Sequence, residues 1–190
     1  MTQIDIRPAI PGDLPAILAL YSELESPDFR PDLGEALAAL NEMRRYPNYV
    51  VYVLASETEI VGTFALLIMV NIAHRGAPSG IVEDVVIHPK WQGLGLGKVM
   101  MRWAMDACRR AGCYKLVLSS NQKREAAHRF YESLGFERHG FSFSVALSSD
   151  DDHAVARSAA PVSMEDAPEI SSVQGWPAGE STQAKPHAHQ

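Results

Sequence analysis

The sequence predicts an α/β protein whose mixed, largely antiparallel sheet contains one central parallel pair of strands and is flanked by helices. Segments with a two-residue apolar period alternate with segments of helical period over most of its 190 residues. In the middle of the chain a strand, a helix and a second strand follow one another. Such a crossover makes the two strands parallel. The length suits one domain with an appendage.

The first third of the chain predicts one strand and two helices. Residues 4–6 alternate apolar and polar side chains, as a strand with one buried face does. Asp13 is expected to cap a helix that runs to about residue 24, and Asp32 a helix over about 33–45. Short carboxylates favour these positions because they accept hydrogen bonds from the first helical turn.

The next part predicts three further strands. The runs YVVYVLA (49–55) and EIVGTFALLIMV (59–70) have the composition of strands and are separated by a short turn, which predicts a hairpin. A loop over residues 74–78 follows, and then the run GIVEDVVIH (80–88) predicts a fourth strand. A glycine-rich turn comes directly after it.

The last patterned part predicts two helices and two strands. A helix over about 97–111 leads to the strand YKLVLSS (114–120). A second helix over about 123–134 is stopped by Gly135, and the run FSFSVAL (141–147) predicts a last strand.

Patterned sequence ends near residue 148, so we expect a domain over 1–148 and a disordered acidic tail over 149–190. The tail has four prolines, one aromatic residue and no apolar period. Such a segment buries too little apolar surface to offset its ordering entropy.

Charge is distributed unevenly along the chain, whose formal net charge is -6. Residues 1–87 carry -7, residues 88–148 carry +6 and residues 149–190 carry -5. The basic segment hints at an anionic ligand, although a solvated face has the same composition. The negative total and the lack of a helix-turn-helix pattern argue against nucleic-acid binding.

Features of other protein classes are missing from the sequence. No apolar run approaches the roughly 18–20 residues of a membrane span, and the N-terminus lacks a basic segment followed by an apolar one. We therefore expect a cytoplasmic protein that has no membrane partner. Cys108 and Cys113 match neither a CxxC pair nor a zinc knuckle, which predicts reduced thiols. No metal site is predicted.

The glycine turn at 93–97 predicts a phosphate-bearing ligand. It lies between a strand and a helix, and the free N–H groups of a helix N-terminus bind phosphate when glycines let it approach. A Walker A loop needs Ser or Thr after its lysine, but Val99 follows Lys98. A Rossmann fingerprint needs GxGxxG and a later acidic residue, where this chain has serines at 119–120.

The pattern Gln92-x-x-Gly95-x-Gly97 after IVEDVVIHP, with the later block HRFYESLGF, resembles the acetyl-CoA signature of the GNAT superfamily of N-acetyltransferases. The resemblance covers roughly residues 3–147. The segments GCYKLVLSS and IVEDVV are similar to glucosamine-6-phosphate N-acetyltransferases, and SSNQKREAAHRFYESLGF is similar to aminoalkylphosphonate N-acetyltransferases. The superfamily often has Asn seven residues before its helix tyrosine, where this chain has Arg124.

The resemblance implies that acetyl-CoA binds mainly to the main chain. The turn would hold the pyrophosphate, and the pantetheine arm would lie along the preceding strand. The implied cofactor residues are Val85, Val86, Ile87, His88, Gln92, Gly93, Leu94, Gly95, Leu96, Gly97 and Lys98. Nearby cations that either reach the ribose phosphate or are simply solvated are Lys90, Lys98, Lys123 and Arg124.

Acetyl transfer to an amine needs a base, an oxyanion donor and an acid. Glu83 and Asp84 are the candidate bases, because unpaired carboxylates in an apolar strand must face water or pair with basic residues. Neighbours on a regular strand point to opposite faces, so only one would reach a substrate unless a bulge intervenes. The resemblance suggests a backbone N–H near Val86 for the oxyanion.

Tyr131 is the candidate acid, although an aromatic residue on this helix is also ordinary core. His128 and His74 are weaker candidates. The predicted function is acetyl-CoA-dependent acetylation of a small primary amine, such as an amino sugar phosphate or an aminophosphonate, whose phosphate could meet His74 and Arg75. A non-catalytic acyl-CoA sensor, a protein-lysine acetyltransferase and a homodimeric state stay open.

Overall fold

A computed structural model of the chain describes residues 3–22 and 31–145. Its contacts divide the chain into two compact units, Met1–Ser142 and Phe143–Gln190. The first unit contains a five-stranded sheet in the order β1-β2-β3-β4-β5. Neighbouring strands are antiparallel except for the parallel pair β4–β5, which confirms the predicted mixed sheet.

Most predicted elements are present, with boundaries that differ by a few residues. The strands are β1 (Asp5–Pro8), β2 (Tyr49–Ala55), β3 (Ile60–Met69), β4 (Ser79–Ile87) and β5 (Lys115–Val117). The helices are α1 (Leu14–Tyr21), α2 (Leu33–Met43), α3 (Leu96–Arg110) and α4 (Glu125–Glu132).

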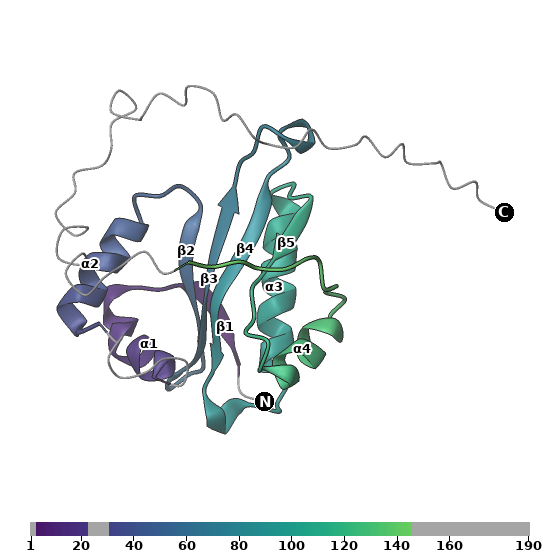
Figure 1. Cartoon of the computed structure of the whole chain (residues 1–190). Coiled ribbons are helices and arrows are strands. Elements are labelled where there is room, and N and C mark those ends of the chain that lie inside the picture. The colour runs from purple at the N-terminus through teal and green to yellow at the C-terminus, as the bar shows by residue number, and fades with distance from the viewer. Residues whose placement is uncertain (1–2, 23–30, 146–190) are drawn as a thin grey trace, which may run out of the picture. The chain divides into compact units, whose positions relative to one another are not determined.

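Helices cover both faces of the sheet. Figure 1 shows α1 and α2 on one side of the strands and α3 and α4 on the other. Buried residues form two clusters accordingly. One joins α3 to the sheet through Phe64, Met100 and Met101, and the other joins α1 and α2 to the sheet through residues such as Ile17 and Ala65. The buried residues of α3, Met100, Met101, Ala104 and Cys108, therefore belong to the core.

The two predicted helix caps have different outcomes. Asp32 accepts a hydrogen bond from the Glu35 N–H at 2.8 Å, and Glu35 accepts one from the Asp32 N–H at 3.0 Å, so this cap is confirmed. Asp13 precedes α1 but makes no capping hydrogen bond to it. Its carboxylate instead accepts two hydrogen bonds from Arg7, at 2.6 and 2.9 Å. These bonds are the main reason that the pKa of Asp13 is lowered, and they tie β1 to the start of α1.

Two predictions near the C-terminal end need correction. The strand predicted over 114–120 shortens to β5, and the chain after Val117 no longer pairs with β4. The described part of the predicted strand 141–147, residues 141–145, forms no strand. Phe141 and Phe143 are 88% and 92% exposed. Apolar alternation favours a strand only where a neighbouring strand and a core face are available. The predicted tail, 149–190, lies outside the described residues.

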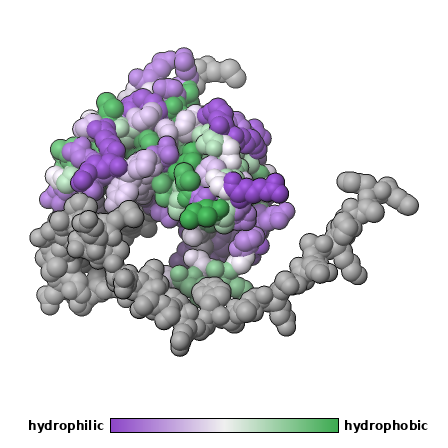
Figure 2. All heavy atoms as spheres, turned by 90° about the horizontal axis from the view of Figure 1, so that it is seen from above, coloured by the Kyte–Doolittle hydropathy of each residue, from purple (hydrophilic) through white to green (hydrophobic). Residues whose placement is uncertain are grey.

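Seen from the end that carries the β3–β4 connection, the described surface is mostly hydrophilic with scattered apolar side chains (Figure 2). In the part of the chain that the structure describes, no helix is long and apolar enough to cross a membrane.

Cys108 and Cys113 are free, as predicted. The pKa of the Cys108 thiol is raised to about 12, mainly by burial. The Cys108 thiol is therefore a poor nucleophile at neutral pH.

Candidate active site

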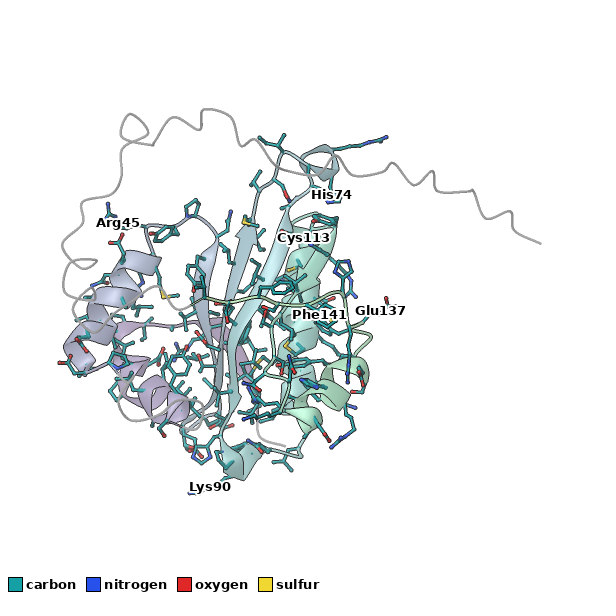
Figure 3. The ribbon with its side chains drawn as sticks, in the orientation of Figure 1. Arg45, His74, Lys90, Cys113, Glu137 and Phe141 are labelled. Atoms are coloured by element: carbon teal, nitrogen blue, oxygen red, sulfur yellow. The ribbon has the colours of Figure 1, made fainter. Side chains whose placement is uncertain are left out.

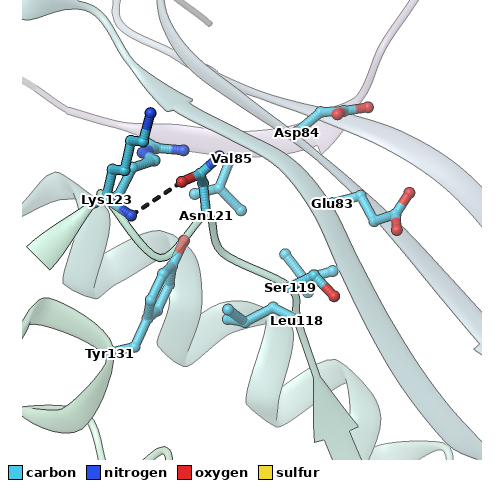
Figure 4. Close-up of a pocket in the computed structure, with 10 residues that line it drawn as sticks. Glu83, Asp84, Val85, Leu118, Ser119, Asn121, Lys123 and Tyr131 are labelled. Atoms are coloured by element: carbon cyan, nitrogen blue, oxygen red, sulfur yellow. Dashed lines mark hydrogen bonds between the residues drawn. The ribbon is translucent and has the colours of Figure 1, made fainter. Parts of the chain in front are cut away.

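A β-bulge in β4 places the two predicted bases. Between the pairs Thr63–Val86 and Ala65–Glu83, β4 has two residues where β3 has one. Asp84 is one of these two residues, and its φ of 53° is left-handed. Glu83 and Asp84 are both exposed, and Figure 4 shows their side chains on the same side of β4. The bulge thus removes the alternation of side-chain direction that would have turned either Glu83 or Asp84 to the opposite face of β4.

A cavity opens where β4 and the chain after β5 separate. The last pair of their parallel ladder is Ile81–Val117, so beyond it the β5-facing backbone of β4 has no ladder partner among the described residues. The cavity has a volume of about 490 Å³. It is lined by Val82, Glu83, Asp84, Val85, Leu118, Ser119, Asn121, Lys123, Arg124 and Tyr131.

Tyr131 of α4 is part of both the core and the cavity. Its ring packs edge-on against Phe130 and Phe136, with centroids 5.1 and 5.8 Å away. Its hydroxyl points toward Asn121 and Lys123 (Figure 4). Burial is the main influence on the pKa of Tyr131 and raises it, so the phenol keeps its proton at neutral pH. The packing role and the acid role are therefore compatible, because they use different parts of one side chain.

Asp84 lies in a partly desolvated setting. Burial raises the pKa of Asp84 although its side chain is exposed in the cavity. Within residues 3–22 and 31–145, neither Glu83 nor Asp84 forms an ion pair. The alternative in which they pair with basic residues is thus not observed there. Tyr49 lies near them: burial raises its pKa, and their negative charges raise it further.

The glycine turn precedes α3, at the end of the same strand. Gly93 and Gly95 have φ of 76° and 81°, a left-handed conformation that side-chain-bearing residues rarely adopt. A Cβ atom at either position would meet nothing within 4 Å, so the space beside the turn is open. Gly97 is different, because a Cβ there would lie 3.1 Å from the Phe130 ring. It lets α3 and α4 pack closely.

Side chains around this turn brace its shape. The side-chain amide of Gln92 donates to the Ile87 carbonyl at 3.0 Å, and the His88 ring accepts from the Lys90 N–H at 3.2 Å. Two of the predicted cofactor residues, Gln92 and His88, thus hold the turn in place. Leu94 is exposed at its tip. At the start of α3 the N–H groups of Lys98 and Val99 donate to the Gly95 carbonyl, at 3.0 and 3.2 Å, so it is the preceding N–H groups, those of Leu96 and Gly97, that are available for a ligand.

The other predicted residues are spread over the molecule. Val85 lines the cavity together with Glu83, Asp84 and Tyr131. His128 does not line it, and its Nε2 lies 3.0 Å from the Asn121 carbonyl oxygen. His74 lies at the opposite end of the sheet from Lys90 (Figure 3) and stacks on Tyr114, with centroids 4.0 Å apart.

His74 and Arg75 therefore do not share the cavity with the predicted bases. His74 and Arg75 come before β4, whose first residue is Ser79. Ser79 is four residues before Glu83, which corresponds to about 13 Å along the strand at its rise per residue. The cavity's own cations are Lys123 and Arg124. Sequence reasoning did not select Leu118, Ser119 or Asn121 as site residues, and their only signal was a position at or just after the end of the predicted strand 114–120 together with, for Asn121, its closeness in sequence to the position of the family asparagine.

Comparison with known proteins adds independent findings. Residues 17–136 match the model of the acetyltransferase (GNAT) family. The chain is 34% identical over 142 residues to a glucosamine 6-phosphate N-acetyltransferase of Trypanosoma brucei brucei, covering 73% of this chain and 92% of the relative. It is 29% identical over 147 residues to an aminoalkylphosphonate N-acetyltransferase of Salmonella typhimurium, covering 77% and 94%. The crystal structure of a Trypanosoma brucei acetyltransferase superimposes with a TM-score of 0.66 at 32% identity, covering 76% and 100%.

Proposed function

The chain belongs to the GNAT acetyltransferase family and is an N-acetyltransferase, and from this premise we propose that it moves the acetyl group of acetyl-CoA to the primary amine of a small, phosphate- or phosphonate-bearing molecule. The observation that carries this proposal is one cavity lined by Glu83, Asp84 and Tyr131, in which the carboxylates form no ion pair with a described residue and the pKa of the phenol is raised by burial. These groups are the base and the acid that the reaction needs.

The arrangement around β4 supports acetyl-CoA as the donor. The β5-facing backbone of β4 beyond Ile81 is free to pair with the amide groups of a pantetheine arm, as an added strand would. The open, left-handed turn at Gly93 and Gly95 lies at the end of that strand, where the helix N-terminus favours a pyrophosphate. A ligand of this kind would bring its thioester between the carboxylates and Tyr131.

In the proposed reaction the acceptor enters as an ammonium ion. Glu83 or Asp84 removes its proton, directly or through water, and the free amine attacks the thioester carbonyl. A backbone N–H near Val86 stabilises the oxyanion, in line with its place after the bulge. Tyr131 donates its proton to the departing thiolate, the second N–H proton of the intermediate passes to water, and the products are free CoA and the acetylated amine.

The acceptor class is inferred from charge and from the relatives. Two carboxylates suit an ammonium group, and Lys123 and Arg124 add positive charge in the same cavity. The two relatives above are named for an amino sugar phosphate and for aminoalkylphosphonates. Amines that carry a phosphate or a phosphonate a few bonds away are therefore the first compounds to test.

The experiment is thiol release from acetyl-CoA across a panel of amines that includes glucosamine 6-phosphate, aminoalkylphosphonates, an aminoglycoside and a lysine peptide. We expect fast release with a phosphate- or phosphonate-bearing amine and slow release with its neutral analogue. A double variant, Glu83→Gln with Asp84→Asn, is the control for background hydrolysis. Acetyl-CoA binding without thiol release on any amine would indicate a sensor, and release with the peptide alone would indicate a protein-lysine acetyltransferase.

A further inference from the structure

Arg124 directly precedes α4, at a position where an arginine does not stabilise a helix. It is the N-cap of α4, and its side chain makes no capping hydrogen bond. Ser, Thr, Asp and Asn are the residues that stabilise an N-cap. A positive charge at a helix N-terminus is also opposed by the helix dipole. A residue that breaks a local rule in this way often serves another purpose.

The charge of Arg124 is free to act inside the cavity. Other arginines near α4 are paired, since Arg129 lies 3.5 Å from Glu125 and Arg138 lies 2.8 Å from Glu132. Arg124 forms no ion pair with any described residue. Its backbone N–H donates to the Asn121 carbonyl at 2.9 Å, which fixes the start of the side chain beside the cavity that Arg124 lines.

Arg124 and Tyr131 line the same cavity. The other charged groups that line it are Glu83 and Asp84 on β4 and Lys123 in the loop before α4. Of all these groups only Arg124 acts on the pKa of Tyr131, which it lowers against the larger effect of burial. The side chains that pack on the Tyr131 ring, Phe130 and Phe136, are apolar and offer no compensating charge.

We propose that Arg124 is a positioning residue for the acetyl transfer, whose guanidinium stabilises the phenolate that Tyr131 becomes after it protonates the leaving thiolate. This proposal rests on the proposed function. In the step, the Tyr131 O–H bond breaks and a bond between that proton and the CoA sulfur forms, while the negative charge moves from sulfur to the phenol oxygen. A proton from water restores the phenol before the next turnover. Without Arg124, burial alone would make the phenol a poor acid.

The first test reads Tyr131 directly and needs no turnover. Replacing Tyr131 with 3-fluorotyrosine gives a fluorine NMR signal that shifts when the phenol ionises, and fluorine lowers the phenol pKa into a range where the protein is more easily kept folded. We expect Arg124→Gln to move the titration midpoint to higher pH and Arg124→Lys to restore most of it. Arg129→Gln, which makes the same charge change outside the cavity, should leave the midpoint in place. An equal midpoint in the parent and in Arg124→Gln would overturn the proposal.

The second test separates Arg124's action on Tyr131 from a contact with a cofactor phosphate. We expect Arg124→Gln to lower kcat about tenfold, because one decade in acidity is about one decade in rate for a proton transfer that limits turnover. The same ratio should appear with S-acetylpantetheine, a thioester without phosphates. A change in KM for acetyl-CoA alone, which vanishes with S-acetylpantetheine, would show instead that Arg124 binds phosphate. If no amine is acetylated, the proposed function fails, while the fluorine titration still decides whether Arg124 controls Tyr131.

Discussion

The glycine turn and the cavity at the β4 bulge lie along the same strand, yet they are built from different parts of the chain. The turn consists of main chain, held open by left-handed glycines at 93 and 95 and braced by Gln92. The cavity consists of side chains that come from β4, the segment after β5, and α4. The turn is contiguous in sequence, whereas the cavity joins residues up to 49 positions apart, from Val82 to Tyr131.

This difference suggests a division of labour. Backbone N–H groups have one fixed chemistry, which suits the binding of a constant group such as a pyrophosphate. Side chains differ in pKa, and the cavity combines a carboxyl group of raised pKa, Asp84, with a phenol of raised pKa, Tyr131. We therefore expect changes in the turn to affect binding of acetyl-CoA and changes in the cavity to affect turnover.

The largest expected effect is in the cavity. Tyr131→Phe keeps the ring and its packing on Phe130 and Phe136 but removes the hydroxyl. We expect turnover to fall roughly 10²-fold or more, the scale of losing a general acid, while acetyl-CoA affinity stays nearly constant. Steady-state kinetics and calorimetry on one preparation measure both. Turnover within about twofold of the parent, with chemistry rate limiting, would remove Tyr131 as the acid and turn attention to a bound water.

The next effect belongs to the turn. Gly95→Val places a branched side chain in the open space beside α3 and strains a left-handed backbone, so we expect acetyl-CoA affinity to fall at least about tenfold. Gly112→Val is the matched control, because Gly112 has φ of 74° and equally open surroundings at the other end of α3. Both variants should lose about 1–2 kcal/mol of stability, and only Gly95→Val should lose binding. Equal binding by the two variants would contradict the phosphate role of the turn.

A smaller effect is expected at Asp84, where activity and stability should move in opposite directions. Asp84→Asn keeps a residue type that tolerates the left-handed conformation, and we expect turnover to fall about five- to tenfold because Glu83 remains. The folded-state pKa of Asp84 is raised, so its ionised form costs stability at neutral pH and the cost disappears as pH falls through that pKa. The variant should therefore melt slightly higher than the parent at pH 7 and no higher near pH 3. Lower stability at pH 7 would contradict this linkage.

The smallest effect should come from outside both regions. Truncation after Ser148 removes a segment whose composition offers no apolar face. We expect acetyl-CoA affinity, turnover and melting temperature to change little, as measured side by side with the full chain. A large drop in melting temperature would show that residues 149–190 stabilise the domain, and loss of turnover at constant stability would show that they reach the site.

The sequence by itself predicted the features that depend on local pattern. Alternating apolar residues identified β2, β3 and β4, the N-cap residue Asp32 identified the start of α2, and the glycine spacing identified the turn before α3. It also singled out Glu83, Asp84 and Tyr131, which the structure brings to one cavity. These signals are readable because strand period, helix capping and backbone strain each involve residues a few positions apart.

Only the tertiary structure decided features that depend on how separate elements pack together. Asp13 reads as a cap but bonds to Arg7, and residues 141–145 read as a strand but form none. The bulge that turns both carboxylates to one side becomes visible only in the pairing of β4 with β3. Arg124 and Tyr131 both belong to the α4 region, but that they line the cavity depends on how α4 packs. These features are set by how elements pack against one another, even where the partners are as close in sequence as Arg7 and Asp13, so the period of a single strand or helix does not encode them.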